Sequence, residues 1–141
     1  MPINQAGLDL IKSYEKCRLT VYDDGRGFAT VGWGHRTTLP LGAEVSQEQA
    51  DAWLAEDLAH AESVVERLVG VPLSDNQRAA LVSFAYNVGA AALERSHLLT
   101  YVNAEEWEQA AGEFHRWSYS RGERLEGLAR RRADEAALFR L

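Results

Sequence analysis

The chain has 141 residues, of which 46% are hydrophobic and 26% are charged, a balance typical of a globular protein that buries its own core. Its formal net charge of −6 argues against a dedicated nucleic-acid-binding protein, because such proteins need a basic surface. The single cysteine, Cys17, excludes an internal disulfide, and we expect it to be a packed thiol.

The chain carries no recognisable targeting or membrane signal. The first residues, MPINQAGLDLIKSYEK, lack the basic start and apolar stretch of a secretory signal. No segment approaches the ~20 apolar residues that a membrane span needs. We therefore expect no membrane span.

The first predicted element is a helix over residues 4–15. Asn4 is a suitable N-cap. Apolar side chains recur in this stretch at helical spacing: Leu8, Ile11 and Tyr14. The pattern ends at Glu15, so this carboxyl lies at the C-terminal end of the helix.

A β-hairpin is predicted next, in a subdomain of about residues 16–45. RLTVY (18–22) alternates as a half-buried strand does, and DDGRG (23–27) has the composition of a turn. FATVGWG (28–34) favours a second strand.

A long connecting helix is predicted over about residues 46–69. Ser46 and Gln49 fit a capping box at its start. One helical stripe is apolar: Ala50, Leu54, Leu58, Ala61, Val65 and Leu68. At about 20 residues the helix would be ~30 Å long, enough to bridge two lobes.

Residues 73–141 predict a helical lobe, to which the first helix also belongs. Ser74 and Gln77 fit a second capping box, and Gly89 is a suitable helix end. Further helices are predicted from near Ser96, through residues 107–117 and over roughly 125–139. The fold class is therefore α+β, with a small hairpin subdomain joined by a long helix to a mainly helical lobe.

Positive charge is concentrated near the C-terminus. Between residues 116 and 132 six arginines stand against Glu123 and Glu126. This segment is either a basic patch that meets an anionic polymer or a solvated helix face.

Glu15, Asp24 and Thr30 have the chemistry of an acid–base site. The negative end of the helix macrodipole disfavours the anion of Glu15, and a general acid must hold its proton near neutral pH. Asp24 lies in a polar glycine-rich turn that favours its anion, and the hydroxyl of Thr30 can hold a water. Taken alone, the same residues also fit an arginine-paired Glu, a turn-forming Asp and a strand-forming Thr.

The spacing of these three residues resembles the pattern E-x8-D-x5-T of the phage-type lysozymes, or endolysins, the family of phage T4 lysozyme. The chain continues as TVGWGH (30–35), like the strand end of that family. Other segments resemble the family in the same order, so that the likeness extends over residues 4–138: GLDLIKSYE, SQEQADAWLAEDL, LSDNQRAALVSFAYNVGAAAL and GLARRRADEAALF.

The resemblance implies a muramidase that cleaves the β-1,4 bond between N-acetylmuramic acid and N-acetylglucosamine for lysis of the bacterial cell wall. Glu15 would protonate the glycosidic oxygen, Asp24 would stabilise the oxocarbenium-like transition state and help activate water, and Thr30 would position that water. The family inverts the anomeric carbon, which calls for about 6.5–9.5 Å between the carboxyls.

The resemblance also implies a sugar-binding set: Gly34, His35, Tyr86 and Asn87. Gly34 would allow close approach of the substrate, and Asn87 would bond an acetamido group. His35 would pair with Asp57 in a mainly structural contact, and Tyr86 fits a core position equally well. One arginine of Arg130, Arg131 and Arg132 would approach Glu15. The four tryptophans are expected to be packing residues, with a place in the sugar cleft as the alternative for Trp117.

Lys16 departs from the family pattern, because many relatives have glycine directly after the catalytic Glu. If this position needs a positive φ, lysine costs of order 1 kcal/mol. A cation beside Glu15 would also move the pH optimum toward acid.

The remaining expectations concern partners and alternatives. We expect no metal and no cofactor, since the histidines show no ligand spacing, and a monomer that acts on bacterial peptidoglycan. We expect it in the host cytoplasm until a membrane lesion releases it to the wall. A lytic transglycosylase would cleave the same bond without water, which the pairing of Asp24 with Thr30 argues against. A non-catalytic peptidoglycan-binding module is the third possibility.

Overall fold

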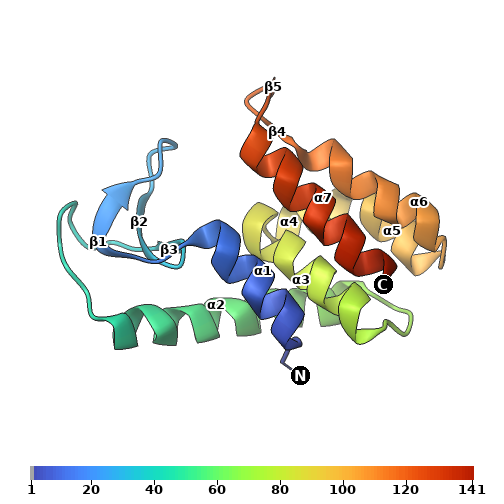
Figure 1. Ribbon diagram of the computed structural model, residues 1–141, viewed down its shortest axis with the longest axis horizontal. Coiled ribbons are helices and arrows are strands. Elements are labelled where there is room, and N and C mark those ends of the chain that lie inside the picture. Colours follow the sequence, from blue (N-terminus) through green and yellow to red (C-terminus); the bar gives the residue numbers. More distant parts are fainter. Residues whose placement is uncertain (1) are drawn as a thin grey trace. The chain divides into compact units, whose positions relative to one another are not determined.

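The structure, a computed structural model, describes residues 2–141, which form α-helices and two small antiparallel β-sheets (Figure 1). The chain divides into two compact units. Unit 1 contains residues 2–10 and 61–141, and unit 2 contains Ile11–His60. The combination of a small sheet region with a mainly helical region confirms the predicted α+β class.

Helix α1 (Gln5–Glu15) ends at the predicted residue. The side-chain oxygen of Asn4 accepts a hydrogen bond from the main-chain N–H of Gly7 at 3.0 Å, which caps the first turn. After Glu15 the chain leaves the helix through Lys16, whose φ is 53°. The left-handed conformation strains a residue with a side chain by about 1–2 kcal/mol, so the strain expected at Lys16 is present.

Unit 2 contains a three-stranded antiparallel sheet in the order β1 (Arg18–Asp23), β2 (Ala29–Gly32) and β3 (His35–Arg36) (Figure 1). The predicted hairpin of two strands is confirmed, but the second strand does not continue through residue 34. Gly32 and Gly34 have positive φ angles of 66° and 83°, which bend the chain into a tight turn and start the third strand.

Helix α2 (Gln47–Leu68) is the predicted long helix, and it contributes residues to both units. The hydroxyl of Ser46 accepts a hydrogen bond from the main-chain N–H of Gln49 at 3.0 Å, which caps the helix as predicted. Four residues of the predicted apolar stripe are buried: Ala50, Leu54, Ala61 and Val65. The apolar stripe predicted from the sequence is therefore the face of α2 that packs inward.

Helix α3 (Asp75–Val88) begins with the predicted capping box. The hydroxyl of Ser74 accepts from the main-chain N–H of Gln77, and the side chain of Gln77 accepts from the main-chain N–H of Ser74. Gly89, with a φ of 91°, ends α3, but it is also the N-cap of a short helix, α4 (Ala90–Arg95). Helix α4 was not predicted from the sequence, because its six residues are too few to show a helical period.

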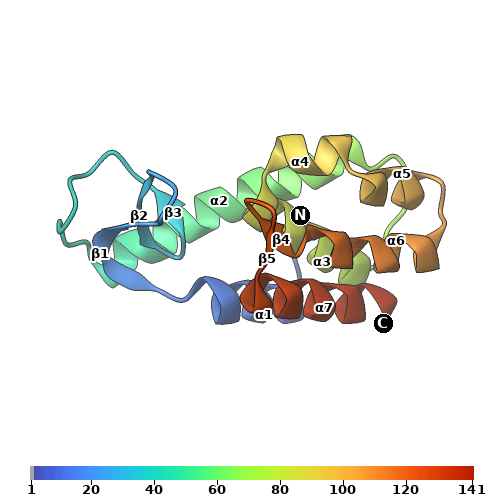
Figure 2. The same cartoon turned by 90° about the horizontal axis from the view of Figure 1, so that it is seen from above.

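The remaining elements are α5 (His97–Asn103), α6 (Trp107–Glu113), the 3-10 helix η1 (Phe114–Trp117), the strands β4 (Tyr119–Ser120) and β5 (Glu123–Arg124), and α7 (Glu126–Arg140). The hydroxyl of Ser96 caps α5 by accepting from the main-chain N–H of Leu99 at 3.0 Å. Helix α5 therefore begins where the sequence predicted a helix, near Ser96. The β4–β5 hairpin, which leads into α7 (Figure 2), was not predicted, because strands of two residues show no alternation.

Aromatic rings form the centre of unit 1. The ring of Phe84 on α3 meets Phe114 edge-on at 5.7 Å and Trp117 edge-on at 5.5 Å. Phe139 on α7 packs against Phe114 at 5.5 Å. Edge-to-face pairs at these separations add to the free energy gained from burial. Trp117 is therefore a packing residue, as predicted, and it helps to hold η1 against α3.

The first turns of α1 approach α3 closely at Gly7. A Cβ atom placed on Gly7 would lie 2.7 Å from the Cβ of Ala79. At the same crossing the side-chain amide of Asn4 donates to Asn76 at 2.8 Å. Glycine at residue 7 is therefore required by packing rather than by backbone conformation.

We expect Gly7→Ala to lower the free energy of unfolding, although alanine favours a helix by about 1 kcal/mol over glycine. Overpacking a tight contact costs about 1–3 kcal/mol, which outweighs that gain. Gly112 in α6 is the control, because its added Cβ would meet nothing within 4 Å, and Gly112→Ala should stabilise. Urea denaturation compares the two variants. Stabilisation by Gly7→Ala would contradict the close contact.

Candidate active site

Glu15 lies against the turn that joins β2 to β3. A Cβ atom placed on Gly34 would lie 2.5 Å from Oε1 of Glu15 and 3.3 Å from its Cδ. Gly34 also has a φ of 83°, which residues with a side chain rarely adopt. Both its conformation and its contact with the carboxyl therefore require glycine. Gly34 was selected from the sequence for approach of the substrate, and its contact with Glu15 was not predicted.

Asp24 is held in the turn between β1 and β2 by main-chain donors. Its Oδ1 accepts hydrogen bonds from the N–H groups of Arg26 at 2.7 Å and Phe28 at 3.2 Å. The bond from Arg26 is the largest influence that holds the pKa of Asp24 below its usual value, and the charge of Arg36 acts in the same direction. Asp24 is therefore an anion near neutral pH. Both main-chain bonds use Oδ1, which leaves Oδ2 for another partner.

Thr30 is buried on β2, and its hydroxyl donates a hydrogen bond to the carbonyl oxygen of Phe28 at 3.2 Å. Because the hydroxyl proton is used there, the oxygen offers its lone pairs to any further partner. The main-chain N–H of Asp24 donates to the same carbonyl at 3.1 Å. The main chain of Phe28 thus links Asp24 to Thr30.

All three residues of the predicted acid–base set lie in unit 2. The charges of both carboxyls, Glu15 and Asp24, act on the hydroxyl of Tyr22 on β1. Burial raises the pKa of Tyr22, Arg18 lowers it, and the charges of Glu15 and Asp24 raise it. Both carboxyls therefore lie near enough for their charges to act on this hydroxyl. Tyr22 was not selected from the sequence, because a tyrosine in a strand carries no local signal of a site.

His35 on β3 is tied to α2 within unit 2. Its Nδ1 lies 2.8 Å from Oδ2 of Asp57, and its ring stacks on Trp53 with centroids 4.5 Å apart. The predicted pairing of His35 with Asp57 is confirmed. Near the start of α2 the indole N–H of Trp33 donates to Asp51 at 2.9 Å and lowers the pKa of that carboxyl.

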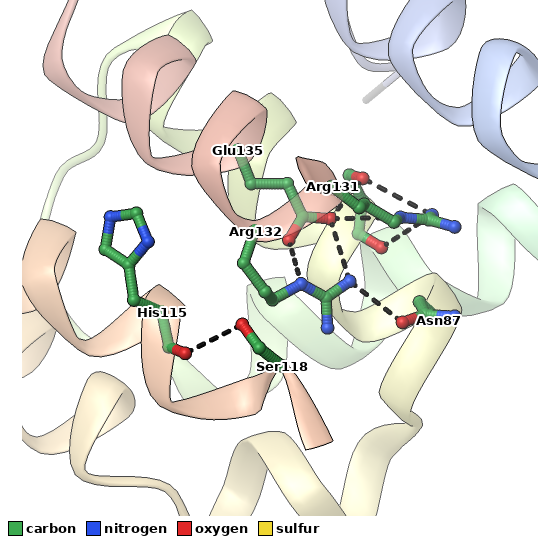
Figure 3. Close-up of polar contacts among 7 residues, drawn as sticks. Asn87, His115, Ser118, Arg131, Arg132 and Glu135 are labelled. Carbon is green, nitrogen blue, oxygen red and sulfur yellow. Dashed lines mark hydrogen bonds and ion pairs between the residues drawn. The ribbon is translucent and has the colours of Figure 1, made fainter. Parts of the chain in front are cut away.

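Tyr86 and Asn87, the other predicted sugar-binding residues, lie near the end of α3 in unit 1. Tyr86 is half-buried and Asn87 is exposed. The side-chain oxygen of Asn87 accepts a hydrogen bond from Nη2 of Arg132 at 2.8 Å (Figure 3). Because that oxygen is occupied, Asn87 presents its amide N–H₂ group as the donor to any further ligand.

Arg132 is part of a buried ion cluster that joins α7 to α3 (Figure 3). Oε1 of Glu135 lies 2.7 Å from Nε of Arg132, and Oε2 lies 3.3 Å from Nε of Arg131. The hydroxyl of Ser83 donates to Oε2 at 2.6 Å. Burial raises the pKa of Glu135, while Arg132 and Arg131 act in the opposite direction.

The arginine-rich segment 116–132 does not form a continuous basic patch. Arg131 and Arg132 are buried against Glu135, and Arg116 pairs with Glu113 at 3.2 Å. The basic-patch interpretation is therefore wrong for Arg131 and Arg132, because the helical spacing that pairs them with Glu135 turns them inward. Four arginines of this segment remain exposed: Arg116, Arg121, Arg124 and Arg130.

Neither a metal-binding cluster nor a membrane-spanning helix is found within residues 2–141. These residues contain no group of three or more His, Cys, Asp or Glu side chains arranged to hold a metal ion. The helices of the same residues include none that is both long and apolar enough to span a membrane. Cys17 is half-buried, with its sulfur 3.6 Å from the side-chain amide of Gln47.

Comparison with known proteins identifies one family. The family model described as Phage lysozyme matches residues 12–135. The chain is 41% identical over 143 residues to the endolysin of Acyrthosiphon pisum secondary endosymbiont phage 1, covering 99% of this chain and 98% of that one. It is also 41% identical over 142 residues to the endolysin of Bacillus phage B103, but it spans only 54% of that longer relative.

A solved structure supports the same fold. The muramidase domain of SpmX from Asticaccaulis excentricus matches with a TM-score of 0.88 and 39% sequence identity, over 97% of this chain and 96% of that one. This agreement confirms the lysozyme-like fold that the resemblance of the sequence predicted.

We expect Glu135→Gln to lower the free energy of unfolding by about 3–5 kcal/mol, because it leaves two buried guanidinium groups without a counter-charge. Glu108→Gln is the matched control: its ion pair with Arg140 is exposed, with side-chain accessibilities of 78% and 43%. Such pairs contribute about 0–1 kcal/mol. Thermal denaturation measures both variants. Equal changes in the two would contradict a structural role for the buried cluster.

Proposed function

The chain belongs to the phage lysozyme family and is a glycoside hydrolase of the kind that degrades peptidoglycan, and we propose that it cleaves the β-1,4 bond between N-acetylmuramic acid and N-acetylglucosamine with inversion. The observation that carries this proposal is the pair formed by Asp24 and Thr30. The main-chain N–H of Asp24 and the hydroxyl of Thr30 both donate to the carbonyl of Phe28, and each side chain retains an acceptor for a proton of water. That arrangement suits hydrolysis by a bound water.

In this mechanism Glu15 is the general acid. It donates its proton to the glycosidic oxygen as the bond to the anomeric carbon breaks, so the leaving sugar departs as an alcohol. Glu15 is the last residue of α1, and its carboxyl lies against the turn at Gly34.

Asp24 and Thr30 act on the attacking water. One proton of the water is directed to Oδ2 of Asp24 and the other to the hydroxyl oxygen of Thr30, whose own proton is donated to Phe28. A lone pair of the water is then left to attack the anomeric carbon from the face opposite the leaving group, and the proton that the water loses passes to Oδ2 of Asp24. The anion of Asp24 also stabilises the positive charge that develops on the sugar ring.

The remaining predicted residues receive supporting roles. Gly34 gives the carboxyl of Glu15 room beside the backbone, and Asn87 donates from its amide to an acetamido carbonyl. Tyr86 packs on a sugar face, and His35 holds β3 to α2 near the substrate.

We further propose that residues 1–141 work as a monomeric domain built from a hairpin subdomain (16–45), a connecting helix (46–69) and a helical lobe (73–141 with 4–15). Kinship with endolysins supports action on the host cell wall. We propose that the enzyme accumulates in the host cytoplasm and reaches the wall through a membrane lesion.

We expect Glu15→Gln to lower the rate of glycan cleavage by about 100- to 10,000-fold, because an amide cannot donate the required proton. Purified peptidoglycan is digested in H₂¹⁸O and the products are analysed by mass spectrometry. The wild type should give reducing ends that carry ¹⁸O. Glu94→Gln, an exposed glutamate on α4, is the control and should leave the rate unchanged.

Two outcomes would overturn the assignment. Anhydro ends without ¹⁸O would indicate a lytic transglycosylase, and binding of peptidoglycan without cleavage by the wild type would indicate a binding module. Cleavage that survives Glu15→Gln would remove Glu15 from the role of acid.

We expect Gly34→Ala to lower the cleavage rate by up to about 100-fold, because the new Cβ displaces the carboxyl of Glu15 by a large fraction of an ångström or more. Gly42→Ala is the matched control: Gly42 has a φ of 87°, close to that of Gly34, but an added Cβ would meet nothing within 4 Å. Both variants should lose similar stability, and only Gly34→Ala should lose activity. Equal activities would show that the contact with Glu15 has no catalytic consequence.

A further inference from the structure

Phe28 is the residue through which Asp24 and Thr30 are connected. Its main-chain N–H donates to Oδ1 of Asp24 at 3.2 Å, and its carbonyl accepts from the N–H of Asp24 at 3.1 Å and from the hydroxyl of Thr30 at 3.2 Å. A rotation of this residue would therefore move both side chains at once.

The side chain of Phe28 is not held by the apolar core. Phe28 is 43% exposed. The guanidinium carbon of Arg36, on β3, lies 3.8 Å from the centre of that ring. A cation this close to an aromatic face is attracted to it, and a planar guanidinium can also stack on it.

Arg36 is itself fixed by the sheet. It is the partner of Thr30 in the β2–β3 ladder, and Thr37 donates its main-chain N–H to the carbonyl of Ala29 at 3.0 Å. The backbone that carries Arg36 is thus bonded to the strand that carries Thr30. The contact of Arg36 with the Phe28 ring therefore connects the strand paired with Thr30 to the residue that binds both Asp24 and Thr30.

We propose that Arg36 and Phe28 are positioning residues: Arg36 holds the Phe28 ring, and the main chain of Phe28 holds Asp24 and Thr30 in the geometry that directs the attacking water. This inference rests on the proposed function. Neither residue touches the substrate in this assignment, and neither was selected from the sequence.

Arg36 also acts on Asp24 through its charge. The groups that face Asp24 within unit 2 are Arg36 from β3, Arg26 from the turn and the hydroxyl of Tyr22 from β1. The charge of Arg36 lowers the pKa of Asp24, so its loss raises that pKa. If catalysis requires the anion of Asp24, the low-pH side of the pH–rate profile, its acid limb, then moves to higher pH.

Three arginine variants test the proposal. Arg36→Gln should lower kcat on soluble glycan strands by about 10-fold with little change in KM, since positioning affects the chemical step, and should move the acid limb to higher pH. Arg36→Lys keeps the charge without the planar group, so it should restore the acid limb and only part of kcat. Arg67→Gln, an exposed arginine in the last turn of α2, removes the same charge and should change neither.

Two phenylalanine variants test the ring. Phe28→Ala should lower kcat to a similar extent as Arg36→Gln, and Phe28→Tyr should restore it, because the aromatic face returns. Urea denaturation of each variant controls for loss of fold. An Arg36→Gln variant that matches Arg67→Gln in kcat and in acid limb overturns the proposal, as does a fully active Phe28→Ala.

Titration of the Asp24 carboxyl by ¹³C NMR separates this inference from the proposed function. The measurement needs no catalysis, so it remains informative if the wild type proves unable to cleave glycans. A higher pKa of Asp24 in Arg36→Gln and in Phe28→Ala than in the wild type supports the arrangement of the two residues. An unchanged pKa in both variants overturns it, whatever the activity.

Discussion

The carbonyl oxygen of Phe28 accepts two hydrogen bonds, one from the main chain of Asp24 and one from the hydroxyl of Thr30, and the polar geometry of unit 2 is built on this shared acceptor. It connects a turn residue to a strand residue through the main chain. It also consumes the proton of the Thr30 hydroxyl, so that this oxygen can only accept from a water. A single main-chain carbonyl thereby holds the backbone of Asp24 and sets the hydrogen-bonding role of the Thr30 hydroxyl.

Glycine serves two different purposes in the chain. At Gly34 a positive φ and the nearby carboxyl of Glu15 both exclude a side chain, whereas at Gly7 only the neighbouring helix does. At Lys16, by contrast, a residue with a long side chain adopts the left-handed conformation that glycine favours. The strain there lies directly beside the proposed acid, which is where proteins tend to retain it.

Features that depend on short-range chemistry could be predicted from the sequence. The caps at Asn4, Ser46 and Ser74 follow from the spacing of neighbouring residues. The third strand and α4 were missed because they are too short to show a period. The contact of Glu15 with Gly34 joins residues that are distant in sequence, and no local pattern records such a contact. The resemblance to a family, rather than the physics of single residues, selected the candidate acid and base.

Unit 1 is assembled from two stretches of chain that are separated by the whole of unit 2. The residues of its first stretch, Asn4 and Gly7, find their partners in Asn76 and Ala79. At a synthesis rate of roughly 5–20 residues per second, α3 therefore leaves the ribosome several seconds after the beginning of α1. Ile11–His60 is complete well before that moment, so the nascent chain has the opportunity to form its small sheet first and to close the helical unit last.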